Sequence, residues 1–198
     1  MRIIALIFIT LSSFGFYAQE KRLALVIGNA NYDKGALQNP VNDALLMKKT
    51  LESLDFDVIL DTNIATLAAF NEVVRKFGEK RDEYNVGFIY YAGHGVQLND
   101  INYLLATKEE YKTEFDVEDK ALSVQKIMRY LTSRTDEVNV LILDACRDNP
   151  FEQNWNPKAR STEGGRGLAR IAPPTGSLIA YSTDAGNTAA DGNGKNSI

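Results

Sequence analysis

Residues 138–149 read V-N-V-L-I-L-D-A-C-R-D-N, an apolar run that ends in Cys146, the only cysteine among 198 residues. The only histidine, His94, follows another apolar run, F-I-Y-Y-A-G-H-G over residues 88–95. Open α/β sheets build their sites from side chains at the carboxyl ends of strands. The two runs therefore predict neighbouring strands that deliver a cysteine–histidine dyad.

Apolar runs typical of strands buried on both faces alternate with amphipathic stretches along the rest of the chain. The expected strands are 22–28, 56–60, 86–92, 138–143 and 177–181, with a short hairpin strand over 101–106. The expected helices are 40–54, 66–77 and a third that Ser123 caps. This alternation predicts an α/β fold in which helices cover both faces of a mostly parallel sheet.

Residues 1–18 read as a signal peptide, with Arg2 before an apolar core and Ala18 before the cleavage point. An uncleaved anchor is the alternative, although the run is short for a membrane span. In both cases we expect export to the periplasm or the extracellular space. If the signal is removed, we expect no stable membrane association. The net charge of -4 argues against a nucleic-acid partner, because such proteins present a basic face.

Residues 149–174 change character, since four prolines and three glycines interrupt any apolar periodicity. They read as a mobile linker within the domain. Residues 183–198 are polar and contain no closing helix, so we expect the fold to continue beyond Ile198.

Each reactive residue has a less specific interpretation when it is taken alone. Cys146 has no cysteine partner in the chain, so it is a buried inert thiol, an intermolecular disulfide or a functional thiolate. His94, between Gly93 and Gly95, marks either a tight turn or a base at the mouth of the sheet. The pair favours catalysis, because a thiolate nucleophile requires a base or cation nearby.

Several segments resemble the bacterial caspase-like peptidases, the metacaspase and orthocaspase branch of the caspase superfamily. They are L-A-L-V-I-G-N-A-N-Y (23–32), L-Q-N-P-V-N-D-A (37–44), Y-Y-A-G-H-G (90–95), N-Y-L-L (102–105), L-D-A-C-R-D (143–148) and S-L-I-A-Y-S-T (177–183). His94 precedes Cys146 by 52 residues, close to the spacing in the caspase signature. The resemblance covers residues 21–198 and implies one caspase-like three-layer α/β/α sandwich, truncated at its carboxyl end.

The resemblance also implies roles for five residues. Cys146 is the nucleophile and His94 the general acid and base, and the backbone N–H groups of Gly95 and Cys146 form an oxyanion hole. Asp43 and Asp144 line an acidic pocket that binds Arg or Lys before the scissile bond. The true caspase signature, Q-A-C-x-G, is absent, so cleavage after aspartate is not implied.

Two positions depart from the pattern of the metacaspases, which often carry serine where Ala92 stands and cysteine where Pro40 stands. No metal or cofactor is implied. Some metacaspases require calcium, and the acidic residues 109–119 are a candidate site, although a solvated loop is the simpler interpretation of this stretch.

The leading functional prediction is a secreted cysteine endopeptidase that cuts polypeptides after Arg or Lys. One alternative is a non-catalytic caspase-like domain for interaction or regulation, and another is an unrelated doubly wound domain with an inert thiol. The linker contains cations but no aspartate, so an enzyme with an acidic pocket is expected to process itself after Arg160, Arg166 or Arg170.

Overall fold

The computed structural model describes residues 20–131, 138–146, 168–169 and 171–182, and all structural statements here concern those residues. Their order is β1 (Arg22–Gly28), α1 (Pro40–Glu52), β2 (Phe56–Thr62), α2 (Leu67–Arg81), β3 (Val86–Leu98), β4 (Ile101–Leu104), α3 (Glu114–Lys120), β5 (Leu122–Ser123), α4 (Val124–Leu131), β6 (Val138–Cys146) and β7 (Ser177–Tyr181). The expected signal peptide, most of the linker with Arg160, Arg166 and Arg170, and residues 183–198 lie outside the described part.

The strands form a mostly parallel sheet, as the sequence predicts. β1 lies between β2 and β3, β3 also pairs with β6, and β6 pairs with β7, with every one of these pairs parallel. The second half of β3 continues past the parallel sheet and pairs antiparallel with β4, which pairs in turn with β5. β3 is therefore shared between the parallel sheet and a hairpin extension, which consists of β4, β5 and α3.

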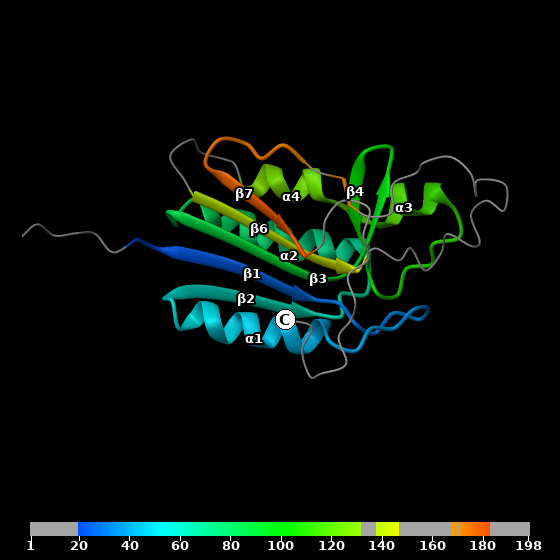
Figure 1. Ribbon diagram of the computed structural model, residues 1–198, viewed down its shortest axis with the longest axis horizontal. Coiled ribbons are helices and arrows are strands. Elements are labelled where there is room, and N and C mark those ends of the chain that lie inside the picture. The colour runs from blue at the N-terminus through cyan, green and yellow to red at the C-terminus, as the bar shows by residue number, and fades with distance from the viewer. Residues whose placement is uncertain (1–19, 132–137, 147–167, 170, 183–198) are drawn as a thin grey trace, which may run out of the picture.

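Helices cover both faces of the parallel sheet, which confirms the three-layer α/β/α arrangement (Figure 1). On one face, Ala44 and Leu51 of α1 pack against β1 and β3. On the other face, α2 and α4 pack against the same strands and against β6, with Phe70 and Ile127 in the shared core. Residues 23–27 of β1 are wholly buried between these layers, which explains their continuous apolar run.

Several predicted elements end at other residues than expected, and β3 and α2 differ most. β3 does not stop at Ala92 but runs through Gly93, His94 and Gly95 to Leu98, so these residues lie within a strand. α2 continues to Arg81 instead of ending at Phe77. Ser123 directly precedes α4, at the predicted cap position, and it also pairs with Tyr103 in the short strand β5.

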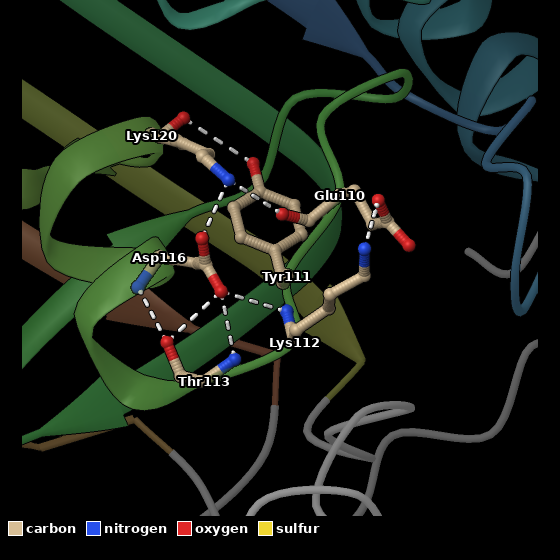
Figure 2. Close-up of polar contacts among 6 residues, drawn as sticks. All are labelled: Glu110, Tyr111, Lys112, Thr113, Asp116 and Lys120. Carbon is tan, nitrogen blue, oxygen red and sulfur yellow. Dashed lines mark hydrogen bonds and ion pairs between the residues drawn. The ribbon is translucent and has the colours of Figure 1, made fainter.

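The acidic stretch 109–119, predicted to be a loop, contains the helix α3. Thr113 and Asp116 form a capping box: the Thr113 hydroxyl accepts from the Asp116 N–H at 3.2 Å, and the Asp116 carboxylate accepts from the Thr113 N–H at 2.8 Å (Figure 2). Lys120 closes the last turn with an ion pair to Asp116 at 2.5 Å. These partners lower the pKa of Asp116, with the Lys120 hydrogen bond as the largest cause.

No helix in the described part of the chain combines the length and the apolar character that a membrane crossing requires.

Candidate active site

The candidate dyad lies where β3 and β6 meet. Their parallel register pairs His94 with Cys146 as its last pair, directly after Gly93 with Ala145. Because paired strands lie about 4.8 Å apart, the two backbone positions are immediate neighbours. The side chain of Cys146 lies outside the described part, so its predicted role as the nucleophile stays a prediction.

The His94 side chain is buried, with 4% of the residue exposed, and two groups from the loop after β1 fix its orientation. The Tyr32 ring packs against the imidazole with a centroid separation of 4.4 Å. His94 Nε2 lies 2.5 Å from the backbone oxygen of Gly35. Since a carbonyl oxygen only accepts, Nε2 carries the proton, and Nδ1 is the basic nitrogen of the neutral ring.

Two asparagines hold that loop in place, and the sequence analysis missed both. Asn29 donates from Nδ2 to the Leu105 oxygen at 3.1 Å and accepts at Oδ1 from the Ile64 N–H at 2.9 Å. Asn63 accepts from the N–H groups of residues 30 and 31, both at 2.9 Å. The only sequence signal was their position, because each directly follows a strand.

Gly95, the other predicted oxyanion donor, follows His94 in β3. The Leu105 N–H donates to the His94 oxygen at 3.1 Å, so the backbone carbonyl of His94 faces the residue that follows β4. Antiparallel ladders alternate, which makes Gly95 and Leu104 a non-hydrogen-bonded pair. The Gly95 N–H therefore points away from β4, as an oxyanion donor requires, although this role stays a prediction.

The two predicted pocket carboxylates both lie near the hydroxyl of Tyr90, a residue that the sequence analysis treated as core. The Tyr90 hydroxyl donates to Asp144 Oδ2 at 3.1 Å. The pKa of Tyr90 is raised, first by burial, then by the negative charge of Asp144, and less by that of Asp43. Asp43 is completely buried in the first turn of α1, whereas Asp144 is partly exposed, so Asp144 is the carboxylate within reach of a ligand.

The acidic stretch contains carboxylates that are already engaged by lysines. Asp116 pairs with Lys120, and Glu110 pairs with Lys112 at 2.9 Å (Figure 2). Within the described ranges, no group of three or more His, Cys, Asp or Glu side chains is arranged to hold a metal ion. Calcium activation stays an untested expectation.

Fold and site together define an α/β domain with its candidate site at the carboxyl edge of a mostly parallel sheet. Residues 21–198 match the caspase domain family of peptidases, and the chain belongs to this family.

Curated relatives include the human mucosa-associated lymphoid tissue lymphoma translocation protein 1, which is 30% identical over 129 residues covering 64% of this chain and 15% of that protein. A probable protease of a Desulfuromonadales bacterium is 28% identical over 159 residues, which cover 65% of this chain and 18% of that protein. The chain thus spans less than a fifth of the length of these relatives.

Two solved structures share the fold. The Drosophila initiator caspase Dronc matches with a TM-score of 0.55 and 11% identity, over 84% of this chain and 58% of that one. A protein from Geobacter sulfurreducens matches with a TM-score of 0.52 and 17% identity, over 70% of this chain and 58% of that one. Both likenesses confirm the caspase fold.

Proposed function

We propose that this caspase-like domain is the catalytic domain of an exported cysteine endopeptidase that hydrolyses peptide bonds after Arg or Lys. The observation that carries the proposal is the register of β3 and β6, which pairs His94 with Cys146. Membership of a peptidase family adds independent support. Export rests on the apolar segment of residues 1–18.

In this mechanism the Cys146 thiolate attacks the scissile carbonyl carbon, and the negative charge that forms on the oxygen is stabilised by the N–H groups of Gly95 and Cys146. His94, in its protonated form, gives its Nδ1 proton to the leaving amine, and the acyl-enzyme remains. Nδ1 then takes a proton from the water that attacks the thioester. The Gly35 carbonyl keeps the Nε2 proton in place throughout.

Specificity for a cation rests on Asp144 and Asp43. Asp144 is partly exposed and accepts from Tyr90, while the buried Asp43 acts on the same hydroxyl more weakly. A guanidinium or ammonium group that contacts Asp144 gains a charge-assisted hydrogen bond. The same preference implies self-processing after Arg160, Arg166 or Arg170, which supply suitable cations in the linker.

The test uses the full-length protein and matched peptide substrates that carry Arg, Lys or Asp before the scissile bond. Cys146→Ala and His94→Ala should each reduce kcat/KM by roughly 10⁴-fold or more, since the two act as a unit. Asp144→Asn should reduce kcat/KM for the Arg substrate by roughly 10- to 100-fold. Asp100→Asn, in the exposed turn after β3, is the matched control and should behave as wild type.

Near wild-type hydrolysis by Cys146→Ala would overturn the catalytic proposal. An inactive wild type whose Cys146 resists alkylation would favour a non-catalytic interaction or regulatory domain. Equal loss of activity toward all three substrates in Asp144→Asn would remove the specificity argument while leaving the dyad intact. For self-processing, mass spectrometry should find a cut after one of the three arginines in wild type and none in Cys146→Ala.

A further inference from the structure

Two buried tyrosine hydroxyls connect the backbone N–H of His94 to its own backbone carbonyl. The His94 N–H donates to Tyr32 Oη at 2.9 Å. The Tyr91 hydroxyl donates to the His94 oxygen at 2.7 Å. The two hydroxyl oxygens lie 3.2 Å apart. The three residues come from the loop after β1 and from two positions of β3.

Distances and the number of protons together favour one direction for each bond. Each phenol has one O–H proton, and the nearest carbonyl acceptor of Tyr91 is the His94 oxygen, because the Leu105 oxygen is 3.4 Å away. With that proton used, Tyr91 Oη accepts from Tyr32, whose hydroxyl lies closer to Tyr91 Oη (3.2 Å) than to the Leu105 oxygen (3.4 Å), while Tyr32 Oη accepts from the His94 N–H. The result is a closed sequence of donors that begins and ends on His94, here called the His94 cycle.

Burial keeps the His94 cycle in its donating form. Tyr91 is wholly buried and Tyr32 is nearly so. The pKa of Tyr91 lies well above its usual value, first because of burial and then because of the neighbouring Tyr32. Hydrogen bonds in a closed, buried sequence polarise one another, so the loss of one member weakens the others.

Gly93, the residue directly before His94, has to be glycine for the cycle to close. A Cβ on Gly93 would lie 2.7 Å from both Tyr32 Oη and Tyr91 Oη, and the residue has a φ of +153°. The Tyr32 ring also packs against the imidazole of His94. Tyr32 thus contacts both the backbone and the side chain of the same residue.

We propose that Tyr32 and Tyr91 are positioning residues for His94, which set the backbone and ring geometry that the general base needs. The kinetic measurements that test this inference rest on the proposed peptidase function. The NMR signal of His94 does not depend on that function, because it reports the environment of the His94 ring directly. Misplacement of a catalytic group by about 1 Å can reduce the rate by roughly 100-fold.

The experiment compares Tyr32→Phe, Tyr91→Phe and the double variant with Tyr111→Phe in the full-length protein. Tyr111 is the matched control, because its buried hydroxyl accepts from the Ala106 N–H at 3.0 Å and donates to the Lys120 oxygen at 3.3 Å, in the same small core as Tyr32. Selective ¹³C labelling of histidine gives the His94 signal, identified by its loss in His94→Gln.

Both single variants should lower kcat by about 10- to 100-fold with KM within about threefold of wild type. Their His94 signal should shift or broaden at fixed pH. Because either substitution opens the whole cycle, the double variant should lose little more than one single variant. Tyr111→Phe should retain both the kcat and the His94 signal of wild type.

Three results would overturn the inference: an unchanged His94 signal in both single variants, equal effects in Tyr111→Phe, or multiplicative losses in the double variant. If wild type fails to hydrolyse any peptide, the proposed function fails, and the His94 signals alone decide the positioning role. If Tyr91→Phe does not fold, as judged by circular dichroism, Tyr32→Phe decides, since Tyr32 lies in a loop outside the strands.

Discussion

Gly93→Ala is the smallest change that tests the geometry around His94. Gly93 lies between the two tyrosine hydroxyls of the His94 cycle and has a φ of +153°. Gly95 provides a control two residues along the same strand, where a Cβ would lie 3.1 Å from Ala145 Cβ and 3.2 Å from Leu168 Cδ2. The two substitutions add the same methyl group to one strand. Only the methyl group at Gly93 would contact the two tyrosine hydroxyls, and only Gly93 has a positive φ, which residues other than glycine rarely adopt.

The contacts around Gly93 set the expected loss of unfolding free energy in Gly93→Ala. Ordinary contacts begin near 3.4 Å, so a Cβ only 2.7 Å from each hydroxyl oxygen requires both phenols to move by about 0.7 Å. Overpacking of this kind costs about 1–3 kcal/mol, and the unfavourable φ costs a further 1–3 kcal/mol or so. We expect Gly93→Ala to lower the free energy of unfolding by about 2–5 kcal/mol. Gly95→Ala has only the milder packing cost, about 1 kcal/mol.

Urea denaturation, followed by tyrosine fluorescence and by far-UV circular dichroism, measures both values on the same protein preparation. The m-values should agree with wild type, so that midpoints report stability. If Gly93→Ala is destabilised no more than Gly95→Ala, the hydroxyls do not enclose Gly93 as described, and the reasoning is refuted.

Three further outcomes concern the scaffold. The hydrogen bond to Asp57, followed by burial, raises the pKa of Tyr84 to about 12 from 10, so its neutral form stabilises the fold below pH 10 and this stabilisation is lost as the pH rises toward 12. The wild type should therefore lose stability relative to Tyr84→Phe over that window in alkaline urea titrations, and parallel curves would contradict this. Asn139→Ala removes a buried acceptor 2.9 Å from Arg81 Nη2 and should cost about 2–3 kcal/mol of unfolding free energy; a loss below about 0.5 kcal/mol would argue against it. Thr113→Ala removes the cap of α3 and should cost about 1 kcal/mol by the same assay, with Thr113→Asn, an alternative cap, retaining most of the stability.

The parallel sheet was predictable because β1 and most of β3, at its centre, are buried and consist of apolar runs. The helix α3 was not, since only Val117 of its seven residues is buried and Phe115 is 75% exposed. A helix without an apolar stripe leaves no periodic signal. Its one local signature was Thr113 three residues before Asp116, which varies the usual capping pair by using aspartate in place of glutamate.

The error at β3 has a different physical cause. The strand was expected to end at Ala92, and the glycines on both sides of His94 were compatible with a tight turn. In the structure the strand continues, and two phenols occupy the space that a Cβ on Gly93 would fill. Sequence patterns report local backbone preference, and this requirement comes from Tyr32, 62 residues away from the N–H it accepts.

In the candidate site, too, the sequence predicted some features and not others. The proximity of His94 and Cys146 followed from two strand ends and the connection rules of parallel sheets. The partners of these residues did not follow, because Tyr90 and Asp144 are 54 residues apart and a tyrosine in an apolar strand looks like core.

β3 belongs both to the parallel sheet and to the antiparallel pair with β4, and this affects how the protein unfolds on heating. Residues 95–98 pair with β4, and the hairpin extension has its own small core, which includes Tyr32, Tyr103 and Leu105. Small cores with few strands form separate cooperative units that open before the whole domain unfolds. Opening of that unit would release Tyr32 from His94 while the parallel sheet stays folded. Thermal inactivation should then precede the main calorimetric transition, and amides of β4 should exchange with deuterium faster than those of β1.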